Sequence, residues 1–153
     1  TEEAKVEDKK TEAPAKVGHT FSGWSTIPAT MPAENIEITG TYNVNSYELT
    51  YVVDGEEVHK DTYTYGATIT PHEAPTKVGY TFNNWVGIPV TMPAEDVIVT
   101  AGWTVNKYEI NSTVTNAEIT GLPEEADYGT EISFTIETST GYSVVSVTYN
   151  GEL

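Results

Sequence analysis

The chain has 153 residues, of which 38% are hydrophobic, and it carries 23 acidic residues against seven lysines, for a formal net charge of −16. This length suits one medium domain or two to three small ones, and the acidic surplus argues against nucleic acid and anionic membrane surfaces as partners. There is no cysteine, which excludes disulfides and zinc–thiolate sites, and no apolar run approaches the roughly 18 residues of a membrane-spanning helix.

The chain opens with a charged segment. Residues 1–12 carry many charges and a single β-branched apolar side chain, a composition typical of a linker or a disordered lead-in. Residues 13–45, which we call the first repeat, contain a loop, a strand around Phe21, an irregular turn and a closing strand. No hairpin precedes these elements, so we expect half a folding unit, with an open strand edge and an uncovered apolar face.

Residues 46–106, the second repeat, contain the elements of one complete unit. Apolar side chains alternate over 47–53, which predicts a strand with one buried face. Asp54-Gly55 is a strong hairpin signal, so 58–65 should return as the second strand. Strands over 80–85 and 97–105 follow, and 92–96 suits one helical turn because proline stands at its first position. The pattern predicts a four-stranded sheet with at most one short helical turn.

Residues 107–153, the third segment, begin like a repeat and then diverge. Alternating patterns predict strands over 111–120, 131–138 and 143–149, and Asn150-Gly151 reads as a further hairpin turn. We expect a related but different β-module that is truncated, and the whole chain to be an interior piece of a longer protein.

The first and second repeats are copies of one sequence. Residues 13–49 align with 74–110 without a gap, at a constant offset of 61, and roughly half of the aligned positions are identical, which chance does not explain. The substitutions keep apolar character, as core positions require. We therefore expect the conserved aromatic pairs to form the structural core of each copy: Phe21 with Phe82, and Trp24 with Trp85.

The run EAPTKVGYTFNNW, followed by IPVTMPAEDVIVTAGW, closely resembles the internalin-type B-repeat, also called the Listeria–Bacteroides repeat. The resemblance covers residues 13–110, and residues 107–153 are similar to divergent bacterial repeats of that kind. It implies a mainly β fold of tandem, small β-grasp-like modules. It also implies arrays in secreted or cell-wall-anchored bacterial proteins, without catalytic residues.

The aromatic side chains allow two interpretations. An exposed row of Trp and Tyr could stack against sugar rings, but aromatics repeated at one register are more typical of a core. Outside that core, the side chains that we expect to be available for ligand contact are Tyr63, Tyr65 and Trp103.

The charged side chains do not form a recognisable catalytic or metal-binding motif. Four acids crowd the predicted hairpin at Asp54, Glu56, Glu57 and Asp61, but they lack the spacing of a calcium-binding loop. The three histidines are scattered, and neither a phosphate-binding loop nor a nucleophile elbow is present. Lysines 16 and 77 could form amide crosslinks, although both stand in loops. We expect no enzyme, no cofactor and no metal.

Two functions follow from these features. The first is a non-catalytic spacer or stalk in an extracellular, cell-surface or cell-wall protein, with an adhesive role and with neighbouring repeats as partners. The second is a glycan- or protein-binding module that accompanies a surface enzyme or adhesin, with a host or cell-wall glycan or protein as its partner.

Overall fold

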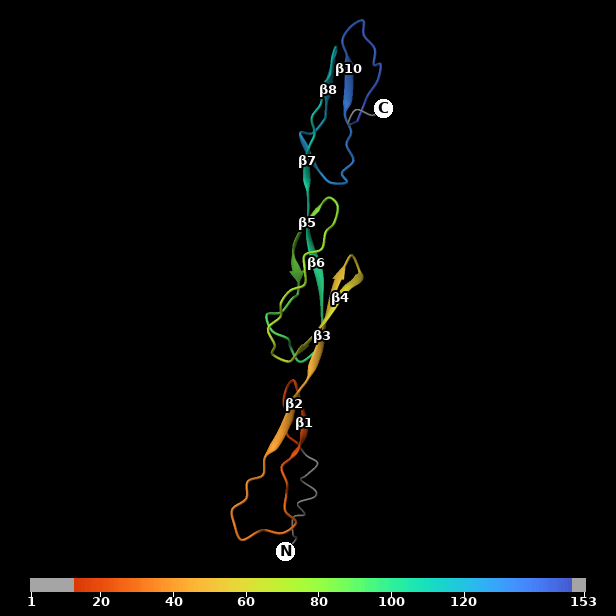
Figure 1. Ribbon diagram of the computed structural model, residues 1–153. Coiled ribbons are helices and arrows are strands. Elements are labelled where there is room, and N and C mark those ends of the chain that lie inside the picture. The colour runs from red at the N-terminus through yellow and green to blue at the C-terminus, as the bar shows by residue number, and fades with distance from the viewer. Residues whose placement is uncertain (1–12, 150–153) are drawn as a thin grey trace. The chain divides into compact units, whose positions relative to one another are not determined.

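The structure, a computed structural model, describes residues 13–149, which contain ten strands and no helix (Figure 1). The predicted mainly β class is therefore confirmed. The predicted lead-in over 1–12 and the turn at Asn150-Gly151 lie outside the described residues. By its internal contacts the chain divides into two compact units, Thr1–Pro75 with Asn84–Gly102, and Thr76–Asn83 with Trp103–Leu153.

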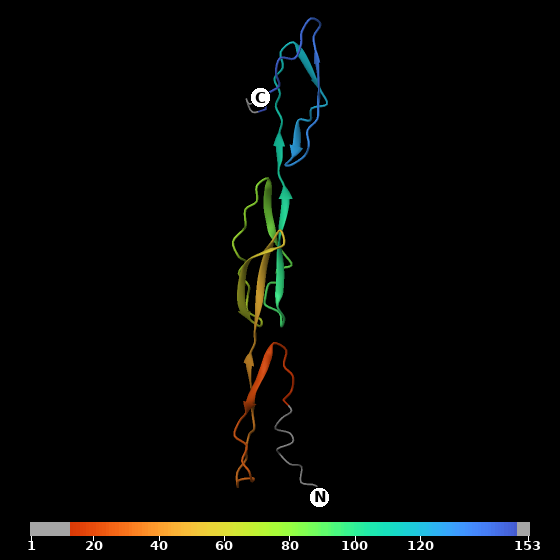
Figure 2. The same cartoon turned by 90° about the vertical axis from the view of Figure 1, so that its right-hand side faces the viewer.

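The second repeat forms the four-stranded sheet expected from its sequence. Its strands are β3 (Ser46–Val53), β4 (Glu56–Thr64), β5 (Tyr80–Val86) and β6 (Val97–Val105), in the order β4-β3-β6-β5. The central strand β3 pairs antiparallel with β4 and parallel with β6, so the sheet is mixed. Both views show the β3–β4 hairpin clearly (Figures 1 and 2).

A two-residue turn connects β3 to β4. Val53 pairs with Glu56, and between them Asp54 and Gly55 have φ angles of 51° and 91°. Positive φ at both central positions is the type I′ geometry, whose twist matches that of the flanking strands. The Asp-Gly dipeptide therefore fixes the register of the hairpin.

The core of the second repeat lies on one face of this sheet. The alternation predicted for β3 buries Leu49 and Tyr51 completely, and in β6 Val99 is buried while the adjacent Ile98 is 70% exposed. The core is completed by three residues outside these two strands, Ile69, Trp85 and Met92.

The predicted helical turn at 92–96 is wrong, because the backbone there has other partners. The N–H of Met92 donates to the carbonyl of Ala67 at 2.9 Å, and its carbonyl accepts from Gly66 at 2.9 Å. The Asp96 carboxylate accepts from the backbone N–H of Glu48 at 2.8 Å. These bonds hold Met92 against residues 66–67 and Asp96 against β3, and they occupy the Met92 carbonyl that would accept the first bond of a helix.

The first repeat contains only the hairpin of β1 (His19–Trp24) and β2 (Gly40–Val44). Its apolar face is exposed, as expected: Met31 is 70% and Ile38 43% exposed, whereas their counterparts Met92 and Val99 are 1% and 0% exposed. Residues 36–39 form no strand, although the equivalent 97–100 pair in parallel with β3. The difference follows from the absence of a β3-like neighbour among the described residues of this repeat.

The third segment forms two separate strand pairs. Strand β7 (Lys107–Glu109) pairs with β9 (Glu125–Asp127), and β8 (Ala117–Thr120) pairs with β10 (Thr135–Thr138). The predicted strands were too long, because 111–116 and 131–134 lie outside them, and 143–148 is not a strand. Strand β9 was not predicted. None of the described residues of this segment is buried, so its strands lack the packing that would extend them.

Candidate functional site

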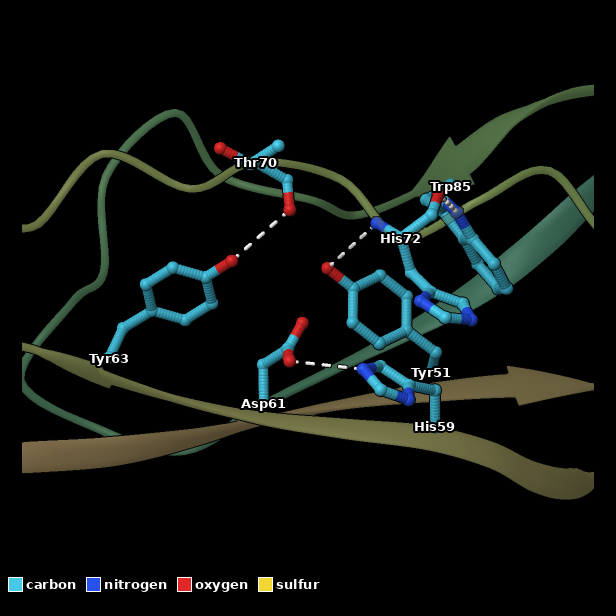
Figure 3. Close-up of polar contacts among 7 residues, drawn as sticks. All are labelled: Tyr51, His59, Asp61, Tyr63, Thr70, His72 and Trp85. Atoms are coloured by element: carbon cyan, nitrogen blue, oxygen red, sulfur yellow. Dashed lines mark hydrogen bonds and ion pairs between the residues drawn. The ribbon is translucent and has the colours of Figure 1, made fainter.

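An aromatic cluster lies over one face of the four-stranded sheet (Figure 3). Trp85 projects from β5 and meets the ring of Tyr51 from β3 edge-on, with centroids 4.8 Å apart. The indole Nε1 of Trp85 donates to the backbone carbonyl of His72 at 3.0 Å. Trp85, only 3% exposed, is therefore anchored by both packing and a hydrogen bond.

Two histidines that appear unrelated in the sequence stack against each other in this cluster. The rings of His59, on β4, and His72, in the following loop, lie 3.8 Å apart and 9° from parallel. The Oδ1 atom of Asp61 lies 3.0 Å from Nε2 of His59 and accepts a hydrogen bond when that nitrogen carries the proton. No sequence spacing indicated this pair, because the loop that returns His72 over β4 is set by the tertiary fold.

The ring of Tyr51 lies 5.8 Å from that of His59 and 5.5 Å from that of His72, centroid to centroid, and its hydroxyl faces the backbone of His72 (Figure 3). This hydroxyl accepts from the backbone N–H of His72 at 3.3 Å, and burial raises the pKa of Tyr51 above its usual value because the phenolate would be poorly solvated. The rings and polar groups of the cluster thus contact one another. Among the residues the structure describes, no three His, Asp or Glu side chains are grouped so as to hold a metal ion.

The equivalent aromatics of the first repeat keep the same ring partner. Phe21 meets Tyr42 edge-on at 5.3 Å, as Phe82 meets Trp103 at 5.7 Å. Phe21 and Phe82 are both half-buried. The two copies therefore build this part of the unit alike.

Trp24 differs from its counterpart Trp85. It packs against Phe21 at 5.2 Å but stays half-buried, and its Nε1 is enclosed without a hydrogen-bond partner in the described structure. Repetition at one register, the signal used in the sequence, indicates equivalent positions but not equivalent neighbours.

The side chains predicted for ligand contact all have internal contacts and are half-buried. The hydroxyl of Tyr63 donates to the carbonyl of Thr70 at 3.1 Å (Figure 3). The ring of Tyr65 lies directly against Gly18. Trp103 lies beneath the ammonium of Lys77, 5.8 Å from Nζ to the ring centroid. Their role in ligand binding stays a prediction.

Residues 47–87 match the family model described as the Listeria–Bacteroides repeat domain. This segment of the chain is similar to that repeat. The resemblance inferred from the motifs is therefore confirmed, and the segment matched covers the β3–β4 hairpin, the histidine loop and β5.

Two curated proteins share the repeat region. Internalin H of Listeria monocytogenes is 36% identical over 87 residues, which cover 50% of this chain and 16% of that protein. A protein of Evansella cellulosilytica described as a Gly-rich membrane protein is 26% identical over 140 residues, 77% of this chain and 16% of its own length. The matches thus span about one sixth of each relative. No solved structure matches the chain.

Two surface acids of the second repeat form ion pairs with one lysine. Nζ of Lys60 lies 3.3 Å from Glu48 and 3.8 Å from Glu57, and the hydrogen bond with Glu48 raises the pKa of Lys60. The lysines considered for crosslinking lie over aromatic rings instead: Lys16 over Tyr42 at 5.4 Å and Lys77 over Tyr80 at 4.7 Å. These contacts are the cation–π type, typical of structural stabilisation.

Two surface hollows lie in the third segment. One of about 320 Å³ is lined by uncharged side chains, among them Ile136, Tyr142 and Val144. Another of about 430 Å³ contains Glu125, whose carboxylate is paired with Lys107 at 2.9 Å. Within the part of the chain that is described, no helix has the length and apolar character to traverse a bilayer.

Proposed function

We propose that this chain is a non-catalytic repeat segment of a bacterial cell-surface or secreted protein, in which it acts as a spacer that carries a more distal part outward. The observation that supports this proposal best is the 61-residue repeat itself, whose motif is shared with Internalin H. Tandem units that contact only their neighbours extend a chain in one dimension.

The use of the aromatic side chains supports a structural role. Trp85 and Tyr51 fill the core, and Tyr63 is hydrogen-bonded to the backbone. Sugar recognition needs aromatic faces open to solvent, whereas the rings of Trp85 and Tyr51 are buried. The spacer role is therefore favoured over a glycan-binding module.

The charge of the chain supports the same role. A net charge of −16 keeps neighbouring modules apart by mutual repulsion and opposes collapse of an array. The same charge keeps the surface soluble at high local density, as a crowded cell surface requires.

Small-angle X-ray scattering of the chain tests the proposal. A compact particle of 153 residues would have a radius of gyration of about 15 Å, and we expect a value well above this at physiological salt. A value near the compact figure would refute the spacer role.

A glycan array and sugar titrations followed by tryptophan fluorescence test the alternative. We expect no array signal and no change of emission. A saturable change with one sugar would favour the binding module, and an unchanged signal in a Trp103→Leu variant would then place the sugar elsewhere.

A further inference from the structure

The connection between the first and second repeats is hydrogen-bonded on both sides. The backbone N–H of Asn45 donates to the carbonyl of Gly18 at 2.8 Å, and its own carbonyl accepts from the N–H of Tyr65 at 2.8 Å. Its side-chain oxygen accepts from the hydroxyl of Thr20 at 2.7 Å. Asn45 is thus tied to the repeat before it and to the repeat after it.

The ring of Tyr65 packs against this connection. Gly18 is buried, has a φ of 69°, and lies so close to the ring of Tyr65 that a Cβ at this position would overlap it. The ring of His19 meets that of Tyr65 edge-on, 5.8 Å away and at 75°. Only glycine allows both the backbone conformation and the approach of the ring.

The connection between the second repeat and the third segment is built in the same way. Asn106 donates to Gly79 and accepts from Tyr128, both at 2.8 Å, and its side chain accepts from Thr81 at 2.6 Å. A Cβ on Gly79 would overlap the ring of Tyr128, which meets Tyr80 edge-on at 6.0 Å and 73°. This geometry survives although the sequence around Tyr128 has diverged.

A third turn shows that glycine is needed for its backbone conformation even where no tyrosine ring approaches it. The N–H of Tyr142 donates to the carbonyl of Ser139 at 3.0 Å, and Gly141 has a φ of 87°. The same turn occurs at Gly18 and Gly79, where His19 donates to Lys16 and Tyr80 donates to Lys77. Yet Gly141 is exposed and nothing lies within 4 Å of its Cβ position. The turn therefore needs glycine without any ring, and the tyrosine is an added feature of the two connections.

We propose that each tyrosine–glycine joint, formed by Gly18, Asn45 and Tyr65 and again by Gly79, Asn106 and Tyr128, is the surface by which one repeat recognises the next. The residues of the first joint all lie in one compact unit, and those of the second joint all lie in the other. The partner of this surface is the following repeat of the same chain. The hydrogen bonds and the ring contact restrict rotation between the two repeats. This inference rests on the proposed spacer function and specifies how the spacer is kept stiff.

Distance measurements between two spin labels test the first joint. The chain has no cysteine, so Ser22→Cys on β1 and Thr62→Cys on β4, both exposed, place one label on each side. Double electron–electron resonance should give a narrow distance distribution for this doubly labelled protein. Tyr65→Ser and Gly18→Ala should each broaden it by about twofold or more, towards the behaviour of a flexible linker.

Two matched variants separate the joint from general damage. Tyr65→Phe keeps the ring and should keep the narrow distribution. Gly66→Ala introduces the same kind of strain, at a φ of 77° with nothing within 4 Å, and should also keep it. Near-UV circular dichroism of each variant reports whether the repeats stay folded.

The proposal is overturned if the unmodified joint already gives a broad distribution, or if Tyr65→Ser leaves a narrow one unchanged in a folded protein. Its failure differs from failure of the spacer role. An elongated particle with broad distances would retain the spacer and reject the joint, whereas a compact particle in scattering would reject the spacer.

Discussion

Trp24 and Trp85 show how strongly the contribution of a side chain to stability depends on its neighbours. Both stand at the same position of the repeat, but Trp85 is 3% exposed and hydrogen-bonded to His72. Trp24 is half-buried, and its Nε1 has no partner in the described structure. An enclosed N–H without a partner costs free energy, so the two indoles should contribute very differently to stability.

We expect Trp85→Phe to lower the free energy of unfolding by about 2–3 kcal/mol, through a lost hydrogen bond and a cavity. Trp24→Phe should change it by less than about 1 kcal/mol, because removing the unpartnered N–H offsets the lost packing. Urea denaturation followed by far-UV circular dichroism measures both. Equal losses in the two variants would contradict the difference in burial.

The phenol of Tyr51 makes stability depend on alkaline pH. Burial raises its pKa in the folded state, so the folded protein holds the proton where the unfolded chain has released it. The stabilisation is complete below the unfolded value of 10.0 and is lost as pH rises through the folded value. Tyr51→Phe removes this dependence.

We expect the free energy of unfolding to fall less steeply above pH 10 in Tyr51→Phe than in the unmodified protein. The variant should be less stable at neutral pH by about 1 kcal/mol, because the N–H of His72 loses its acceptor. Tyr149→Phe, at a tyrosine that is 81% exposed, serves as the control and should keep the steep fall. Urea denaturation at several alkaline pH values measures the slopes.

Among the elements, the β3–β4 hairpin is the one that local sequence controls most directly. The I′ turn needs positive φ at Asp54 and Gly55. Gly55→Ala should cost about 1 kcal/mol of stability, because nothing lies within 4 Å of its Cβ and the cost is conformational alone. Asp54→Asn should be neutral or slightly stabilising. Thermal denaturation compares the two, and an unaffected Gly55→Ala would show that another turn is populated.

Strand formation elsewhere depends on neighbours rather than on local sequence. Residues 36–39 and 97–100 have nearly the same sequence, but only the latter pair with β3. In the third segment, alternation predicted a strand over 143–149 that does not form, and it missed β9, a three-residue strand held by β7. Alternation indicates which face a strand would bury, but a strand forms only where a partner covers that face.

For the molecule as a whole, the charge imbalance should dominate its response to salt. With 23 acidic residues and seven lysines, like charges repel one another throughout the folded chain. Raising NaCl from about 10 to 150 mM shortens the Debye length from roughly 30 to 8 Å. We therefore expect the melting temperature to rise, as measured by differential scanning calorimetry.

A matched variant tests the cause of that salt effect. Glu56→Gln combined with Asp54→Asn removes two negative charges from exposed positions at the turn of the hairpin. The variant should melt higher than the unmodified protein at low salt, and the difference should shrink at high salt. A melting temperature that falls with salt would instead indicate that ion pairs such as Lys60 with Glu48 dominate.

The amino-acid sequence alone was enough to establish the repeat, its resemblance to the Listeria–Bacteroides repeat, the mainly β class and the four strands of residues 46–106. These features depend on motifs, periodicity and turn residues within short stretches of chain. The fold was needed to show that His59 stacks on His72, that Trp85 but not Trp24 is buried, and that Tyr65 packs on Gly18. Each of these contacts joins residues that no local pattern links. Burial and ring packing are properties of what the chain brings together, and the same residue therefore has different partners in two copies of one sequence.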